Sequence, residues 1–150
     1  MQQRIVIVIP TYNNARTVTS VIDGAKTSGL PVIVVNDGST DATGEILKPV
    51  QGIEVITFSV NRGKGAALRS AFEHALTAGY THAITIDADG QHLAADIALF
   101  IDKINEFHPV TECPGCCHHG ILQYQVFYIY FQVYHVNCFI LKTGPSVHTH

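Results

Sequence analysis

The stretch RIVIVIPTYNN, residues 4–14, decides the fold of this chain. Its first six residues, RIVIVI, form a run rich in apolar, β-branched residues and of the length of a buried strand, and a proline and two asparagines then interrupt that run. Beyond the interruption, apolar residues recur at helical spacing, with Asn13 or Asn14 placed to cap the helix and Gly29 placed to end it. The segment therefore predicts a strand followed by a helix.

The same alternation continues through the first two thirds of the chain. Three further strand-like runs follow: PVIVV at 31–35, IEVITF at 53–58 and HAITI at 82–86. A helical pattern follows each run, and the pattern after the second of these runs has a stripe made largely of alanine. Short, almost continuously apolar strands that alternate with helices are typical of a mostly parallel sheet with helices on both faces. We predict an α/β, Rossmann-like fold.

Composition limits what the chain can bind and where it acts. At 150 residues it has the size of one modest domain. The chain has nine basic and 12 acidic residues, so it has no excess of positive charge that would attract a nucleic acid. We therefore expect no nucleic-acid partner. The apolar run near the N-terminus is too short for the core of a signal peptide, so we expect a cytoplasmic protein.

Polar segments follow all four strand-like runs. In an open parallel sheet, ligands bind beyond the carboxyl ends of the strands, where such segments meet. We therefore expect the four segments to share one edge of the sheet. They are PTYN at 10–13, NDGS at 36–39, NRGKG at 61–65 and DAD at 87–89.

The residues at this edge suit a nucleotide diphosphate. Asp87 and Asp89 can direct carboxylate oxygens toward one Mg²⁺ or Mn²⁺ ion, which would bridge phosphates. Arg62 and Lys64 add cationic donors on a glycine-rich loop, and Asp37 is available to accept from a base or ribose. Each feature alone has a simpler interpretation, because Asp-Gly pairs form turns and Asp-x-Asp arises by chance. Their common position favours a binding site.

Four motifs in order, IPTYNN, VNDGSTD, NRGKGAALRSAFEHA and TIDADGQH, closely resemble the nucleotide-binding half of glycosyltransferase family 2. The resemblance covers about residues 3–107 and is closest to the branch with dolichol-phosphate mannose synthases and polyprenyl-phosphate glycosyltransferases. It implies a GT-A fold.

The resemblance also implies roles for individual residues. The nucleoside pocket would be lined by the segment after the first strand, the base would be contacted by the aspartate of the Asp-Gly-Ser motif, and the Asn-x-Gly-Lys loop would lie near the nucleotide. In the Asp-x-Asp (DXD) motif the first acid would serve the nucleoside and the second the metal, together with the glutamine that follows. The nucleotide-binding residues would be Pro10, Thr11, Tyr12, Asp37, Asn61, Gly63, Lys64 and Asp87, and the metal ligands Asp89 and Gln91.

The implied activity is inverting transfer of a sugar from a UDP- or GDP-sugar to a lipid-phosphate or saccharide acceptor. A polyprenyl-phosphate acceptor would place the protein at the cytoplasmic face of a membrane. The family's general base lies in an acceptor-binding half beyond the acid pair, so we expect this truncated chain to be the donor-binding fragment. The alternative is a catalytically inactive nucleotide-binding or interaction domain.

The chain divides into a nucleotide-diphospho-sugar-binding domain at 1–107 and an atypical tail at 108–150. The tail holds all four cysteines and Glu112 as its one acidic residue. Cys113 and Cys116 have zinc-ligand spacing, and residues 121–141 are uncharged and long enough to span a bilayer. We favour a third interpretation, a shifted reading frame or a disordered segment. Its rival is a genuine segment that adds a strand or makes a homo-oligomer contact.

Overall fold

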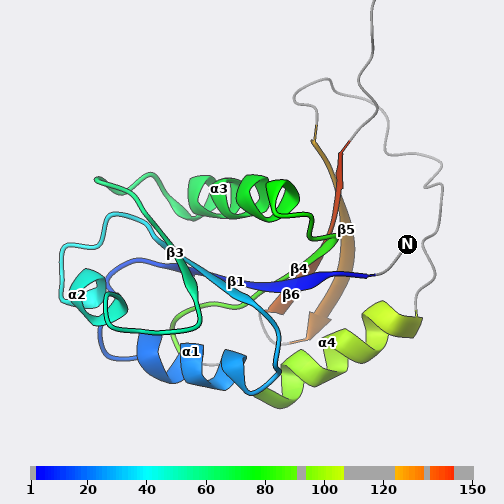
Figure 1. Cartoon of the computed structure of the whole chain (residues 1–150), viewed down its shortest axis with the longest axis horizontal. Helices are drawn as coiled ribbons and strands as arrows, with labels where there is room; N and C mark the ends of the chain where they lie inside the picture. The colour runs from blue at the N-terminus through cyan, green and yellow to red at the C-terminus, as the bar shows by residue number, and fades with distance from the viewer. Residues whose placement is uncertain (1–2, 91–93, 107–123, 134–135, 144–150) are drawn as a thin grey trace, which may run out of the picture.

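The computed structural model describes residues 3–90, 94–106, 124–133 and 136–143. Strands and helices alternate as far as residue 106, and two strands follow (Figure 1). The strands are β1 (Ile5–Thr11), β2 (Val32–Asn36), β3 (Glu54–Thr57), β4 (His82–Thr85), β5 (Tyr124–Val133) and β6 (Val136–Thr143). The helices are α1 (Val18–Lys26), α2 (Thr43–Leu47), α3 (Lys64–Thr77) and α4 (Ala94–Glu106).

The strands form one sheet in the order β3-β2-β1-β4-β6-β5. The first four are parallel, and β1 lies between β2 and β4. Their register aligns Thr11 with Asn36 and Asn36 with Thr57, so β1, β2 and β3 end at the same level. The predicted mostly parallel sheet is confirmed.

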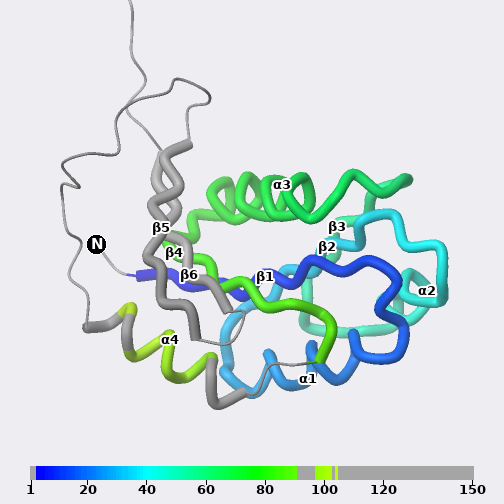
Figure 2. The backbone as a smooth tube through the Cα atoms, turned by 180° about the vertical axis from the view of Figure 1, so that it is seen from behind, coloured from blue at the N-terminus to red at the C-terminus, as the bar shows by residue number. Residues whose placement is uncertain are grey.

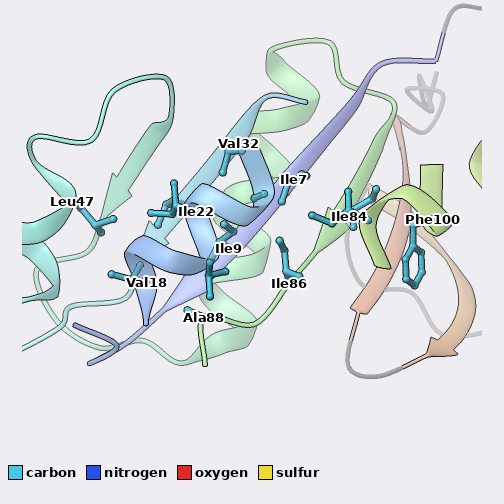
Figure 3. Packing of buried hydrophobic residues seen from close by; sticks show 14 of the residues in the cluster. Ile7, Ile9, Val18, Ile22, Val32, Leu47, Ile84, Ile86, Ala88 and Phe100 are labelled. Atoms are coloured by element: carbon cyan, nitrogen blue, oxygen red, sulfur yellow. The ribbon is translucent and has the colours of Figure 1, made fainter. Parts of the chain in front are cut away.

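Helices cover both faces of the sheet, as predicted. Figures 1 and 2 show α3 on one face and α1 with α4 on the other. Alternate residues of β1 supply the two cores because successive side chains of a strand point to opposite faces. Ile7 and Ile9 pack with the α1 and α4 side (Figure 3), whereas Val6 and Val8 pack under α3.

The alanine stripe of α3 lets that helix approach the sheet closely. Ala67, Ala71 and Ala75 are fully buried against Val6, Val8 and other apolar strand residues. The predicted stripe is confirmed at these positions, and Leu68 and Leu76 lie partly buried beside it. Because α3 packs closely on the sheet, its first residue lies near the edge of the sheet.

Two antiparallel strands extend the sheet beyond β4. β6 pairs with β4, and β5 pairs with β6. Cys138 lies in β6, whereas Cys113, Cys116 and Cys117 fall outside the described residues. Within the described ranges, no helix has the length and apolar character needed to cross a membrane. The reading-frame interpretation of residues 108–150 stays a prediction.

The packing under α3 gives a first prediction. In Ala71→Leu, three added carbon atoms have no space between helix and sheet, so we expect the free energy of unfolding to fall by about 1–3 kcal/mol. Urea unfolding followed by circular dichroism measures the change. Glu73→Leu, which puts the same side chain on an exposed position of α3, is the control and should change stability little. Equal losses in both variants would contradict the packing described.

Candidate nucleotide-binding edge

The four predicted polar segments do lie at one edge of the sheet. The loops that follow β1, β2, β3 and β4 leave the sheet at its same end, nearest α2 (Figure 2). Hydrogen bonds connect these loops to one another, so the edge is a connected structure and not four separate turns. Gln91 and His92, which the sequence places next to the acid pair, lie outside the described residues.

Asp37, at the end of β2, anchors the loop that follows β3. Its side chain is buried, with 3% of the residue exposed. The backbone N–H of Arg62 donates to Oδ1 at 2.7 Å, and the backbone N–H of Gly63 donates to Oδ2 at 2.8 Å. We expected this carboxylate to be available to a ligand, but the protein already occupies both oxygens. A carboxylate has about four acceptor positions, so contact with a base stays a prediction.

Gly38 explains why glycine follows this aspartate. Its φ is +66°, a backbone conformation that residues with a side chain rarely adopt. A Cβ atom here would lie 2.3 Å from the carbonyl carbon of Val60 and 2.4 Å from the backbone nitrogen of Asn61. The two loops therefore touch through backbone atoms, and Asn61, a predicted nucleotide-binding residue, is held at this contact.

Lys64 joins the loop after β3 to the acid pair. Gly63, with φ +89°, precedes the first turn of α3, and Lys64 is the first residue of that helix. The Lys64 Nζ atom lies 2.5 Å from Oδ1 of Asp87, at the end of β4. Both side chains retain solvent access, 59% and 28% respectively. Two motifs separated by 23 residues in sequence thus meet, as predicted.

Arg62 differs from its expected arrangement. We expected its guanidinium to add charge to the anion site, but that group lies over the ring of Phe58, 5.1 Å from the ring centroid. Its backbone N–H is bound by Asp37. Arg62 and Phe58 also line an open depression along α3, which does not include the acid pair. Lys64 is therefore the cation that the loop presents to Asp87.

The loop after β1 carries the predicted nucleoside segment. Pro10 and Thr11 are buried, whereas Tyr12 is 44% exposed and presents its ring at the surface. An aromatic ring in this position could pack against a nucleobase.

Asn13 and Asp41 fasten this loop to the loop after β2. Asn13 has φ +55°, a conformation that asparagine tolerates better than most residues. Its Oδ1 accepts from the backbone N–H groups of Thr40 at 2.8 Å and Asp41 at 3.3 Å. In return, Asp41 Oδ2 accepts from the backbone N–H of Ala15 at 3.2 Å. We call this reciprocal pair of contacts the Asn13–Asp41 clasp.

The ionisation of Asp41 supports the clasp. The nearby Thr43 hydroxyl and the Thr43 backbone N–H, which donates to Oδ1 at 2.9 Å, lower the pKa of the Asp41 carboxyl because they favour its charged form. The carboxylate is therefore charged, and a strong acceptor, at neutral pH.

The predicted N-cap of the first helix was wrong. We expected Asn13 or Asn14 to cap the first helix, but α1 begins at Val18, with Thr17 in the cap position. Asn14 Oδ1 instead accepts from the backbone N–H of Tyr12 at 3.1 Å. Both asparagines serve the loops, because the chain needs several residues to turn away from the sheet edge before the helix begins.

The acid pair suits a divalent ion that arrives with phosphate groups. Asp87 and Asp89 occupy one turn, and Asp89 is exposed. Among the described residues no group of three or more histidine, cysteine, aspartate or glutamate side chains could hold a metal alone. Mg²⁺ is commonly bound by one or two carboxylates with phosphate oxygens and water. The donor set therefore fits an ion whose coordination a nucleotide diphosphate completes.

A parallel sheet with interconnected polar loops at its carboxyl edge defines a doubly wound α/β domain of the nucleotide-binding kind. The sequence model of "Glycosyl transferase family 2" matches residues 6–132. The chain belongs to this family, which confirms the resemblance seen in its motifs. The match continues past residue 107, where we expected the resemblance to end.

Curated relatives agree with this membership. Glycosyltransferase AglJ of Haloferax volcanii is 37% identical over 101 residues, which are 67% of this chain and 32% of AglJ. Polyprenol monophosphomannose synthase of Mycolicibacterium smegmatis is 30% identical over 111 residues, 69% of this chain and 42% of that protein. The chain thus spans less than half the length of these relatives.

Solved structures agree on the fold. S. aureus TarS 1–349 matches with a TM-score of 0.52 and 25% identity, over 67% of this chain and 33% of TarS. CMP:2-keto-3-deoxy-manno-octonic acid synthetase matches with a TM-score of 0.52, over 69% of this chain and 48% of that one. At 19% identity, the second likeness concerns the fold alone.

The anchoring role of Asp37 gives a second prediction. In Asp37→Asn, an NH₂ group replaces one oxygen and faces a backbone N–H, which leaves a part-buried donor without an acceptor. We expect the free energy of unfolding to fall by about 1–3 kcal/mol. Hydrogen exchange at the amides of Arg62 and Gly63 should also accelerate.

Asp23→Asn is the matched control, because it makes the same chemical change at an exposed position of α1. Denaturant unfolding and amide exchange followed by NMR measure both effects. If the two variants were equally stable and exchange at Arg62 and Gly63 were unchanged, Asp37 would not be the anchor of this loop.

Proposed function

We propose that this chain binds the nucleotide-diphospho-sugar donor of a glycosyltransferase. The observation that carries the proposal is the 2.5 Å contact between Lys64 Nζ and Asp87 Oδ1. It brings the cation at the start of α3 to the acid pair that follows β4. Family membership supplies the reaction class, and the loops at this edge supply groups suited to each part of such a donor.

The nucleoside would lie between the loops after β1 and β2. The exposed Tyr12 ring would pack against the base, with Pro10 and Thr11 behind it. Asp37 would use its remaining acceptor positions for the base, and Asp87 would accept from a ribose hydroxyl. Asn61, Gly63 and Lys64 would face the diphosphate, where the Lys64 ammonium can offset phosphate charge.

Asp89 and Gln91 would hold a Mg²⁺ or Mn²⁺ ion together with the phosphates. When bound, the ion offsets the negative charge that develops on the departing diphosphate. The role of Lys64 is compatible with this, since its contact with Asp87 partly neutralises the acid pair before the donor arrives. Because the ion would be held by Asp89 and by the phosphates together, binding of metal and nucleotide should reinforce each other.

The reaction would be an inverting displacement at the anomeric carbon of the sugar. An acceptor oxygen forms a bond to that carbon on one face, and the bond to the diphosphate breaks on the other. The bonding electron pair leaves with the nucleotide diphosphate, and any acceptor proton passes to a base in an acceptor-binding half. The residues described here would orient the donor and stabilise the leaving group.

The acceptor would be a polyprenyl phosphate or a saccharide. The names of two relatives favour the former: the polyprenol monophosphomannose synthase and the dolichyl-phosphate beta-glucosyltransferase of Saccharomyces cerevisiae. A polyprenyl phosphate would bring the chain to the cytoplasmic face of a membrane.

A second candidate function is nucleotide binding without catalysis. It is favoured by the composition of residues 108–150, in which Glu112 is the one acidic side chain. Such a domain would retain the binding edge described above and would lack sugar transfer.

Isothermal titration with UDP and with GDP, each with Mn²⁺ or with EDTA, tests donor binding. We expect one of the two nucleotides to bind more tightly with Mn²⁺, and Asp89→Asn to weaken that metal-dependent binding by about tenfold or more, or about 1.4 kcal/mol. Asp102→Asn, an exposed change on α4, is the control. Binding of neither nucleotide, or equal binding by wild type and Asp89→Asn, would contradict the proposal.

Transfer of radiolabelled sugar to a polyprenyl phosphate or to a saccharide, measured together with hydrolysis of the donor, separates the two candidate functions. Nucleotide binding together with transfer supports the glycosyltransferase. Nucleotide binding with neither transfer to either acceptor class nor hydrolysis of the sugar donor supports the second candidate.

A further inference from the structure

We propose that Thr17 positions the acid-pair turn for the divalent ion and the diphosphate; this inference rests on the proposed function. Its hydroxyl donates to the backbone carbonyl oxygen of Ala88 at 2.5 Å, across 71 residues of sequence. Ala88 lies between the two acids Asp87 and Asp89. No motif in the sequence singles out Thr17, because its partner is a backbone atom on a distant segment.

The Thr17 side chain lies beside the turn on both sides of Asp89. Before the acid, its hydroxyl binds the Ala88 carbonyl. After the acid, Gly90 adopts φ +85°, and a Cβ atom there would lie 3.4 Å from Cγ2 of Thr17. The hydroxyl and the methyl group of one side chain thus border the residues that flank Asp89.

β4 ends just before this turn. The backbone N–H of Ile86 donates to the carbonyl of Val8 at 3.0 Å, which is past the end of β4. Ala88, 4% exposed, is packed in the core beside Ile9 (Figure 3). The hydrogen bond from the Thr17 hydroxyl therefore holds the chain where the hydrogen bonds between strands have ended. We infer that this bond orients Asp87 and Asp89.

Thr17 is itself held in place. Its backbone N–H donates to the carbonyl of Asn14 at 3.1 Å, and its own carbonyl accepts from Val21 at 3.0 Å in the first turn of α1. A threonine in the cap position commonly uses its side-chain oxygen to accept from the helix. This hydroxyl makes no such bond. Its contact is directed to the turn after β4, so removing the hydroxyl does not remove a helix cap.

Two substitutions separate the hydroxyl from the shape of the side chain. Thr17→Val keeps the branched shape and the Cγ2 contact near Gly90 but cannot donate to Ala88. Thr17→Ser keeps the donor. Groups that orient metal ligands typically change metal affinity by about 10- to 100-fold when they are removed.

The experiment is titration of the wild type and both variants with the nucleotide diphosphate that binds the wild type, UDP or GDP, in Mn²⁺ and in EDTA. We expect Thr17→Val to lower affinity in Mn²⁺ by about tenfold and to leave affinity in EDTA within about twofold. Thr17→Ser should restore the affinity in Mn²⁺. Mn²⁺ EPR gives a second readout, in which the amount of bound ion follows the same order.

The outcomes distinguish this inference from the function on which it rests. If the wild type binds with Mn²⁺ dependence and both variants match it, Thr17 has no positioning role while the donor site stands. If Thr17→Val weakens binding equally in Mn²⁺ and EDTA, the residue supports the fold and not the ion, and the proposal is overturned. If the wild type binds neither nucleotide, the proposed function fails first.

Discussion

The buried carboxylate of Asp37 accepts hydrogen bonds from two backbone N–H groups. These two bonds hold together the loops at the carboxyl edge of the sheet. Through them, the end of β2 fixes the loop after β3, and that loop sets the first residue of α3. Lys64 is then in reach of Asp87 at the end of β4. One carboxylate thus connects three strand ends, and hydrogen bonds of this kind, with a charged acceptor, are stronger than neutral ones.

The segment between β1 and α1 performs the complementary task. The Asn13–Asp41 clasp fastens it to the loop after β2, and Thr17 fastens it to the turn after β4. It begins from the central strand, so it can contact the loops of both neighbours. This arrangement is possible because the four parallel strands β1–β4 end on the same side of the sheet. The alanine face of α3 brings that helix close enough for its first residue to reach these strand ends.

Local patterns predicted the first four strands, the helices and the shared edge. Continuous apolar runs mark buried parallel strands, and the alanine stripe of α3 shows at helical spacing, so both are visible within a few residues of sequence. The meeting of the motifs follows from topology, since the carboxyl ends of parallel strands converge. Lys64 and Asp87 could therefore be placed at one site before their contact was known.

Side-chain hydrogen bonds between distant loops could not be predicted in the same way. Asn13 and Asn14 have the sequence character of helix caps, and only the three-dimensional approach of the loops decides that they bind loop backbone instead. Arg62 looks like an anion ligand until Phe58 is seen beneath its guanidinium. Thr17 acts on a carbonyl 71 residues away, and a backbone acceptor leaves no mark in the sequence. The β5–β6 pair lies in the segment for which we favoured a reading-frame shift or disorder, although both strands are rich in β-branched and aromatic residues.

The most direct test of the account is a crystal structure of the chain with Mn²⁺ and a nucleotide diphosphate, with the ion located by its anomalous scattering. The account predicts an anomalous peak at Asp89, bridged to phosphate oxygens, with the diphosphate beside Lys64 and the base against Tyr12. A nucleotide bound with its diphosphate on another surface, or an ion held without any contact to the turn after β4, would contradict it.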